Sequence, residues 1–255
     1  MKVNDYFSGR ILNIGHRGAP EAAPENTIPS FLKALELGAD GIELDVTLSR
    51  DGEIVVFHNY LLPKTTDGKG LLARQTLSEL QSLDAGSHFS VDYAGTCIPT
   101  LEELVEAVGE ETFFMIEIKT NPFSVKGIEK AVAQFIGKHN MYHRVVVSSF
   151  SPLDLRRVRY YDNKIPLGLL NVPILPFFMN RFSFKTFAQA EVVHPMHQLV
   201  NRKFLKHARA GGVKTMAWTV NRKKDMERMV DLGVEGVITN YPELFDEVLK
   251  EKNKK

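Results

Sequence analysis

The chain has 255 residues, of which 44% are hydrophobic and 25% are charged, a balance typical of one large folded domain or two small ones. Its 32 lysines and arginines nearly match its 31 aspartates and glutamates, so no overall field favours a nucleic acid or an anionic membrane. We also expect no signal peptide in residues 1–15 and no membrane anchor, because no apolar run is long enough. Cys97 is the only cysteine, which excludes an internal disulfide and makes a reducing cytoplasm the expected setting.

Short β-branched runs alternate with longer amphipathic stretches along almost the whole chain. The runs that predict strands are Ile11–Gly15, Gly41–Val46, Ile54–Phe57, Phe113–Ile118, Val145–Ser148, Leu167–Leu170, Val192–His194, Lys214–Thr219 and Val237–Thr239. Helix-like spacing of apolar residues occurs at Thr27–Leu37, Leu101–Val108, Val125–Lys138, Pro152–Tyr160, Asn201–Ala210 and Lys223–Leu232. This alternation predicts repeated βα units with a mostly parallel sheet. We therefore expect a single α/β domain over residues 1–255, built as a (β/α)8 TIM-type barrel.

One unit of this barrel must be irregular, because nine strand-like runs are one more than eight strands require. The link Ser49–Gly52 is too short to hold a crossover helix, so Ile54–Phe57 is either a barrel strand or an excursion. Residues 60–100 begin with the turn-rich segment Thr65–Gly70 and predict an inserted lobe over one barrel end. At the other end of the chain, Lys250–Lys255 is typical of a frayed polar tail.

Three carboxylates lie in predicted strands, near the strand ends where such barrels build their active sites. Glu43 and Asp45 are two residues apart and so point to the same face, and Glu117 belongs to a later strand. Carboxylates that converge inside an apolar barrel repel one another unless a cation neutralises them, and an all-oxygen set favours Mg²⁺ or Ca²⁺. The alternatives are a salt-bridge network with Arg17 and Lys119, or carboxylates that face solvent.

Two histidines follow predicted strands: His16 at the end of the first, and His58 after Ile54–Phe57. Both are candidates for a general acid and base, although a lone histidine is more often a structural residue. Arg17 and Lys119 add a guanidinium fork and a point charge, both suited to phosphate oxygens. Two histidines, two cations and three carboxylates together predict a phosphoryl-transfer site.

A set of motifs in sequence order carries a more specific signal. They are Gly15–Gly18, Pro24–Thr27, Gly41–Val46, Val55–His58, Thr65–Gly68, Glu117–Lys119, Ser148–Phe150, Trp218–Asn221 and Gly233–Asn240. Together they run over almost the whole chain and strongly resemble the glycerophosphodiester phosphodiesterase family. The joint pattern is far more specific than any one of its pieces.

The resemblance implies a barrel enzyme that hydrolyses glycerophosphodiesters to glycerol 3-phosphate and an alcohol. It implies that one divalent cation, Mg²⁺ or Ca²⁺, is held by Glu43, Asp45 and Glu117. His16 and His58 would form the acid/base pair, and which of them is the acid stays open. A small-molecule glycerophosphodiester is then the expected partner, with the preferred alcohol left open.

The resemblance also implies how the substrate is bound. Arg17 and Lys119 would contact the phosphate. Trp218 would form a wall for the glycerol or the leaving group, or else a buried aromatic anchor. Glu25 and Asn26 would organise the loop after the first strand, either as a helix-capping segment or through direct contact with the metal or the substrate.

This chain departs from the family pattern at one position. The family usually has aspartate after the second histidine, and this chain has Asn59. Asparagine can form hydrogen bonds but carries no charge, so it gives weaker electrostatic support to a protonated His58. The departure bears on the pH optimum more than on the reaction class.

Other interpretations stay open beside this one. Residues Val172–Met179 predict either an apolar lip for transient lipid contact or a loop packed on the barrel, and a lysophospholipase D-like enzyme would use the same site. A non-catalytic phosphate-binding barrel is disfavoured because it would not need the two histidines. An aldolase or isomerase that uses Lys119 as a Schiff base is disfavoured because neighbouring carboxylates keep that amine protonated.

Overall fold

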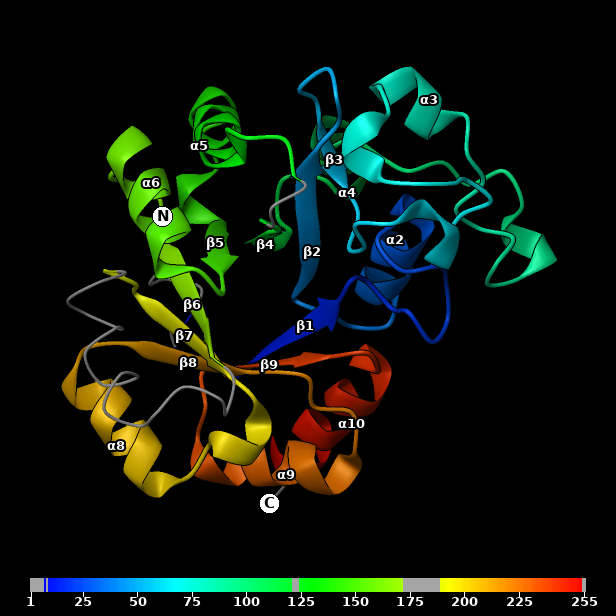
Figure 1. Ribbon diagram of the computed structural model, residues 1–255. Helices are drawn as coiled ribbons and strands as arrows, with labels where there is room; N and C mark the ends of the chain where they lie inside the picture. Colours follow the sequence, from blue (N-terminus) through cyan, green and yellow to red (C-terminus); the bar gives the residue numbers. More distant parts are fainter. Residues whose placement is uncertain (1–6, 8, 121–123, 172–188, 254–255) are drawn as a thin grey trace.

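In the computed structural model, whose described residues are 7, 9–120, 124–171 and 189–253, eight parallel strands form a closed ring. β1 pairs with both β2 and β9, which closes the sheet (Figure 1). The strands are β1 Leu12–His16, β2 Gly41–Leu48, β4 Phe113–Ile118, β5 Val145–Ser149, β6 Leu167–Asn171, β7 Val192–Pro195, β8 Lys214–Ala217 and β9 Gly236–Thr239. The predicted TIM-type barrel is confirmed.

The ninth predicted strand, β3 (Ile54–Val56), lies outside this ring. It pairs antiparallel with the end of β2, with Val46 opposite Val56. The turn between them is closed by Ser49, whose hydroxyl donates to the Asp51 carboxylate and accepts from the backbone amide of Glu53. The irregular unit is therefore an excursion that extends β2, which decides the question that the sequence left open.

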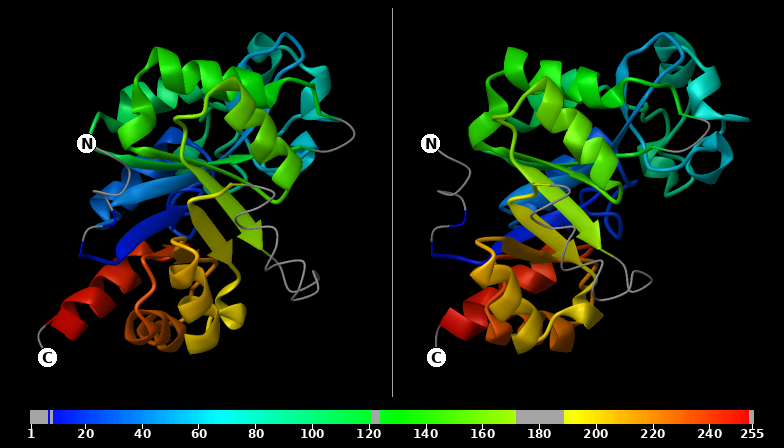
Figure 2. Two further views of the ribbon diagram at one scale, coloured as in Figure 1. Left: turned by 90° about the vertical axis from the view of Figure 1, so that its left-hand side faces the viewer. Right: turned by 60° about the vertical axis from the view of Figure 1, so that its left-hand side comes forward.

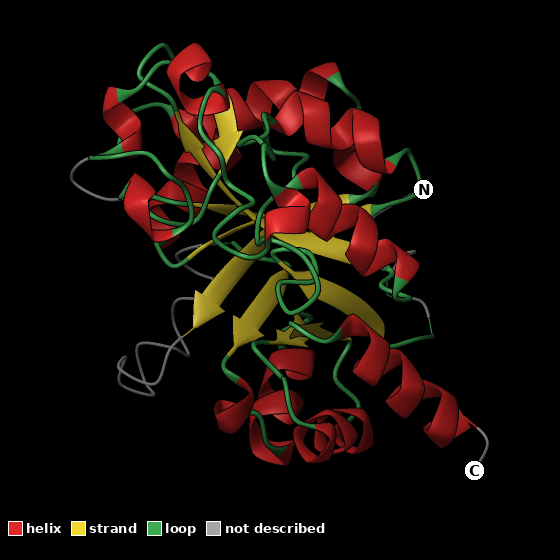
Figure 3. Ribbon diagram, turned by 90° about the vertical axis from the view of Figure 1, so that its right-hand side faces the viewer, coloured by secondary structure: helices red, strands yellow, loops and turns green. Residues whose placement is uncertain are grey.

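Helices cover the outside of the ring, as Figures 2 and 3 show. They are α2 Ile28–Glu36, α4 Leu101–Val108, α5 Ile128–Lys138, α6 Pro152–Tyr161, α8 Arg202–Ala210, α9 Lys223–Leu232 and α10 Pro242–Asn253. The short helix α3 Leu77–Gln81 lies apart from them, in the lobe between β3 and α4 (Figure 1). Short 3-10 turns lie at Leu62–Lys64, Leu72–Arg74, Val91–Tyr93, Met141–His143 and His197–Leu199. Within the described part of the chain, no helix is long and apolar enough to cross a membrane.

The prediction of a frayed tail from Lys250 was wrong as far as Asn253, because these residues complete α10. Phe245 and Val248 bury one face of this helix against the barrel, and Lys250 pairs with Asp246 one turn earlier. The polar end is thus the last turn of an anchored helix.

Between β3 and α4 the chain forms a lobe with its own small apolar core. The buried residues of this core are Val55, Phe57, Leu62, Leu72, Leu80, Ala85 and Ile98. The short helix α3 begins with a capping box in which Thr76 and Glu79 satisfy each other's backbone amides. The Tyr93 hydroxyl donates to the carbonyl of Ala22 and so ties the lobe to the loop after β1.

Alternate residues along the strands divide the core into two parts. One set faces the helices, and the other fills the barrel interior with Leu12, Ile14, Phe113, Met115, Val146, Val192, Met216 and Ile238. Side chains two residues further along the same strands point to the same interior face. At those positions apolar residues give way to polar or aromatic ones, namely His16, Glu117, Ser148, His194, Trp218 and Asn240. The barrel interior therefore has a layer of apolar side chains and, closer to the carboxyl ends of the strands, a layer of polar and aromatic side chains.

Candidate active site

A cavity of about 250 Å³ opens at the carboxyl ends of the strands. Its lining combines charged and polar residues with apolar ones. The lining residues are His16, Arg17, Glu43, His58, Glu117, Lys119 and Ser148, together with Met115, Phe150, Leu170, Trp218 and Ile238. The structure thus brings seven of the eight residues predicted for the site to one cavity, and the eighth, Asp45, lies in contact with Lys119.

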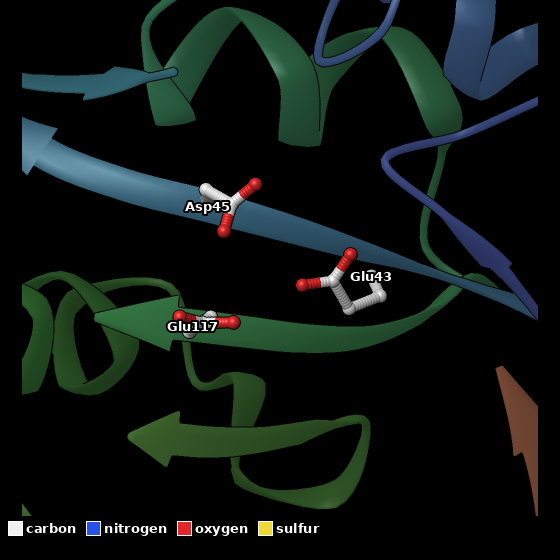
Figure 4. A group of neighbouring side chains, drawn as sticks. All are labelled: Glu43, Asp45 and Glu117. Atoms are coloured by element: carbon white, nitrogen blue, oxygen red, sulfur yellow. The ribbon is translucent and has the colours of Figure 1, made fainter. Parts of the chain in front are cut away.

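Glu43, Asp45 and Glu117 converge from two neighbouring strands, as Figure 4 shows. All three are buried, and Asp45 lies opposite Glu117 in the parallel pairing of β2 with β4. One carboxylate oxygen from each residue lies within 4.8 Å of the others, so the group could hold a metal ion. Hard oxygen donors of this kind suit Mg²⁺ or Ca²⁺.

Two cations also contact these carboxylates. The Lys119 Nζ lies 3.1 Å from Asp45 Oδ1 and 2.7 Å from Glu117 Oε1. The Arg17 Nε lies 3.4 Å from Asp45 Oδ2, and its Nη1 donates to both oxygens of Glu25 at 3.1 and 3.2 Å. The predicted salt-bridge network is therefore present as well. However, four carboxylates, those of Glu25, Glu43, Asp45 and Glu117, lie around only these two cations. The network therefore does not balance the negative charge.

The pKa values of the carboxyl groups follow from this imbalance. Burial and the neighbouring carboxylates raise the pKa of Glu43 well above its usual range. Burial and Asp45 raise the pKa of Glu117 to about 7. Burial also opposes ionisation of Asp45, but Lys119 and Arg17 outweigh it and lower its pKa to about 2. Ionisation of the two glutamates is therefore disfavoured, and an additional cation would stabilise their charged forms.

The loop after β1 has a strained backbone, and its side chains hold Asp45 of the carboxylate cluster in place. Arg17 and Asn26 both have left-handed backbones, with φ of 56° and 57°, a conformation that costs about 1–2 kcal/mol for an L-residue. The Asn26 amide group donates to Asp45 Oδ2 at 2.9 Å and accepts from the Asp45 backbone amide at 3.2 Å. Thr27 caps α2. The capping role thus belongs to Thr27, whereas Asn26 fixes Asp45 and Glu25 fixes Arg17.

His16 is held by a residue from the other end of the chain. Its Nδ1 lies 2.7 Å from the Asn240 side-chain oxygen, and the Asn240 amide nitrogen donates to Glu21. Because an amide oxygen only accepts, Nδ1 carries the proton and Nε2 presents its lone pair. Burial, followed by the charge of Arg17, lowers the pKa of His16 to about 4. Asn240 was part of a motif in the sequence, but its contact with His16 could not be predicted from the motif.

His58 has a local partner. Its Nδ1 lies 3.2 Å from the Asn59 side-chain oxygen, so the residue that departs from the family pattern orients this ring. Burial, together with the charges of Lys119 and Arg17, lowers the pKa of His58, and the charge of Asp45 and the contact with Asn59 offset this only in part.

The apolar side of the cavity is built around Trp218. Its indole N–H donates to the carbonyl of His194 at 2.6 Å, which fixes the ring. The Phe150 ring meets it edge-on, with centroids 5.6 Å apart. This aromatic pair lines the cavity together with Met115, Leu170 and Ile238. The apolar segment predicted at Val172–Met179 lies outside the described residues.

Comparison with known proteins decides the family. A model described as "Glycerophosphoryl diester phosphodiesterase family" matches residues 16–244, which span the first histidine to α10. The chain belongs to this family.

Relatives of the glycerophosphoryl diester phosphodiesterase family match along nearly their whole length. A glycerophosphodiester phosphodiesterase of Caldanaerobacter subterraneus is 40% identical over 92% of this chain and 96% of that protein. A second, from Bacillus subtilis, is 34% identical over 98% of this chain and 90% of that protein.

Solved structures of the family agree with the fold. A phosphodiesterase of Oleispira antarctica in complex with the product sn-glycerol-3-phosphate is 27% identical, with a TM-score of 0.82 over 96% of this chain and 99% of that one. A glycerophosphodiester phosphodiesterase of Thermotoga maritima is 26% identical, with a TM-score of 0.73 over 94% of this chain and 98% of that one. The chain is thus an enzyme, a phosphoric diester hydrolase, rather than a non-catalytic barrel.

Proposed function

We propose that this enzyme hydrolyses glycerophosphodiesters to glycerol 3-phosphate and an alcohol, with a divalent cation and two histidines. The observation that carries the proposal is the convergence of three buried carboxylates, two histidines and two cations at one cavity that is also lined by apolar residues. The product complex of the Oleispira antarctica relative supports the same product for this chain.

The carboxylate cluster fits a divalent cation. Glu43, Asp45 and Glu117 would hold it. The raised pKa values of the two glutamates support this, because they indicate that Arg17 and Lys119 alone do not neutralise the cluster. Mg²⁺ or Ca²⁺ bound there would stabilise negative charge on the phosphate oxygens. Arg17 and Lys119, at the edge of the same cavity, would contact those oxygens from the protein side.

The two histidines would divide the proton transfers. His16 presents a lone pair at Nε2, and its lowered pKa of about 4 keeps the ring neutral near pH 7, so this lone pair is free to accept a proton from an attacking hydroxyl. The pKa of His58 is lowered as well, by burial, Lys119 and Arg17, but Asp45 and Asn59 both stabilise its protonated ring. It is the better candidate to donate a proton to the departing alcohol. Trp218 would pack against the carbon skeleton of the glycerol.

The decisive assay measures glycerol 3-phosphate released from glycerophosphocholine. We expect no release by metal-free protein in chelator, and release after Mg²⁺ or Ca²⁺ is added in excess. Lysophosphatidylcholine run in parallel tests the lipid alternative. Full turnover in chelator, with the absence of metal verified by elemental analysis, would refute the metal requirement. No turnover of any glycerophosphodiester with either ion would refute the proposed reaction.

A further inference from the structure

A pair of polar side chains, Ser148 and His194, is buried inside the barrel next to the catalytic cavity. The Ser148 Oγ lies 3.1 Å from the His194 Nε2, and both residues have 0% of their surface exposed. Ser148 also lines the catalytic cavity, and it lies opposite the proposed metal ligand Glu117 in the pairing of β4 with β5. The metal site and the proton transfers proposed above use neither member of the pair.

Gly168 makes room for this pair. Ser148 belongs to β5 and His194 to β7, and β6 lies between these two strands. The imidazole reaches Ser148 across β6 at Gly168, where an added Cβ would lie 2.2 Å from His194 Nε2 and 2.6 Å from Ser148 Oγ. Any side chain at this position of β6 would therefore displace the pair.

The stability of the fold does not account for the pair. A buried hydroxyl and a buried imidazole both lose their hydration, and the hydrogen bond between them compensates for only part of that loss. Two apolar side chains of similar shape would fill the same space without this penalty. Burial also lowers the pKa of His194 to about 3, so the ring is neutral near pH 7 and does not act as a base there. The distinguishing feature of the pair is thus the Ser148 hydroxyl in the cavity wall.

This hydroxyl keeps hydrogen-bonding capacity for a ligand. It has one donor and two acceptor positions, and within the described residues His194 is its one side-chain partner. If Ser148 donates to His194, two acceptor positions stay free, and if it accepts, the donor and one acceptor position stay free. An alcohol fits either case, because its hydroxyl both donates and accepts. His194 therefore orients Ser148 without using up its capacity to bind a ligand.

We propose that Ser148 binds the terminal hydroxyl of the glycerol moiety, and that His194 is the positioning residue that holds Ser148 for this contact. The inference rests on the proposed function, because it takes the phosphate to lie at Arg17 and Lys119. The 2-hydroxyl of glycerol then stays beside the phosphate, whereas the terminal hydroxyl is the polar group furthest from it. The His194 carbonyl also accepts the indole N–H of Trp218, so one residue holds both a polar and an aromatic part of the cavity wall.

An analogue of glycerophosphocholine without the terminal glycerol hydroxyl tests this contact. We expect the parent enzyme to prefer glycerophosphocholine to the analogue by about tenfold in kcat/KM, the scale of one hydrogen bond lost in a buried site. Ser148→Ala should lose most of this preference, because only the reaction of glycerophosphocholine depends on the serine hydroxyl. Ser149→Ala is the matched control and should keep the preference, since the hydroxyl of this neighbouring buried serine donates to Asp154.

His194→Phe distinguishes a positioning role from a purely structural one. The variant keeps an aromatic ring but removes Nε2, so the preference should fall as in Ser148→Ala, and combining the two substitutions should add little. His194→Gln keeps an amide that can bond to Ser148 and should retain more of the preference. A residue that only supported the fold would slow both substrates equally, so an unchanged preference in His194→Phe would overturn its positioning role.

Binding without turnover separates this inference from the proposed reaction. Trp218 is the only tryptophan of the chain and lines the same cavity, so its fluorescence reports the binding of glycerol 3-phosphate in the presence of Mg²⁺ or Ca²⁺. Ser148→Ala should raise the Kd of glycerol 3-phosphate about tenfold and leave that of the analogue without the terminal hydroxyl unchanged. Equal Kd values for glycerol 3-phosphate in the parent and in Ser148→Ala would overturn this inference alone. A parent protein that does not bind glycerol 3-phosphate would refute the proposed function and this inference with it.

Discussion

The backbone amide of Arg17 donates to Glu43 twice, to its carbonyl oxygen at 2.9 Å and to its carboxylate Oε2 at 3.0 Å. The first bond continues the pairing of β1 with β2, and the second orients the side chain of a proposed metal ligand. The left-handed backbone of Arg17 is thus coupled to the position of Glu43.

Glu43→Gln should separate metal binding from folding. The glutamine oxygen can still accept from Arg17, whereas repulsion with Asp45 and Glu117 is relieved. We therefore expect Tm in chelator to equal or exceed that of the parent, and the rise in Tm on adding Mg²⁺ or Ca²⁺ to be lost. Thermal unfolding with and without metal measures both, with the exposed Glu53→Gln as control. A full metal-induced rise in the variant would exclude Glu43 as a ligand.

His16→Ala and His58→Ala should each lower kcat by roughly 10²-fold or more, the scale of lost acid–base catalysis. Steady-state assays with saturating metal measure the effect, and His88→Ala in the exposed part of the lobe is the control. Near-normal turnover in either variant would remove that histidine from the mechanism.

Asn59→Asp should shift the pH dependence of kcat to higher pH. A carboxylate at the position that contacts His58 Nδ1 would favour the protonated ring and raise its pKa. An acid with a higher pKa stays protonated at higher pH, so the alkaline limb of the kcat profile should shift to higher pH. If His58 is the base instead, the acidic limb should shift in the same direction while the alkaline limb stays in place.

Buried His194 should make the protein sensitive to acid. Burial lowers its pKa to about 3, whereas the usual value is 6.5. Between these values the unfolded chain binds a proton that the folded chain does not. Stability from this residue is therefore complete above 6.5 and is lost as the pH falls toward 3.

The test of this pH dependence is urea unfolding at several pH values in chelator. His194→Gln should flatten the decline of unfolding free energy below pH 6.5, and the exposed His88→Gln should leave it unchanged. Equal slopes for His194→Gln and the parent would contradict the assignment.

An analogue without the glycerol 2-hydroxyl should distinguish the two possible nucleophiles. If that hydroxyl attacks phosphorus, a cyclic phosphate forms as the alcohol leaves, and water opens the ring in a second step. The internal attack gains from effective molarities on the order of 10⁵ M or higher. We expect turnover of the deoxy analogue to collapse while it still competes for binding. Turnover comparable with the parent substrate would favour direct attack by water.

Much of the barrel could be predicted because its strands have a distinctive composition. Runs such as Phe113–Ile118 are buried on both faces, so their apolar character marks them clearly. Ile54–Phe57 has a similar composition; the short link before it marked the unit as irregular, but only the antiparallel pairing shows that it lies outside the ring. The helix over Pro242–Asn253 was missed because its exposed face is strongly polar near the end of the chain.

The clustering of the candidate residues at one end of the barrel could be predicted, but their contacts with one another could not. Parallel strands bring their carboxyl ends to one mouth, which is why Glu43 and Glu117 meet although they are far apart in sequence. Partners such as Asn26 for Asp45 and Asn240 for His16 depend on loop conformation, for which composition gives no signal. For the same reason the sequence could not predict how the salt-bridge network and the metal cluster would share carboxylates.

The bond between His16 and Asn240 has a consequence for how the enzyme is made. Residues 16–119 contain both histidines, both cations and all three carboxylates, yet His16 gains its partner, and β1 its second neighbour, only from the final βα unit. During synthesis these residues are therefore made well before β9 and Asn240, which β1 and His16 need as partners. The ring can close only after β9 and the start of α10 have been made, when the Asn13 side chain can also donate to the carbonyl of Pro242.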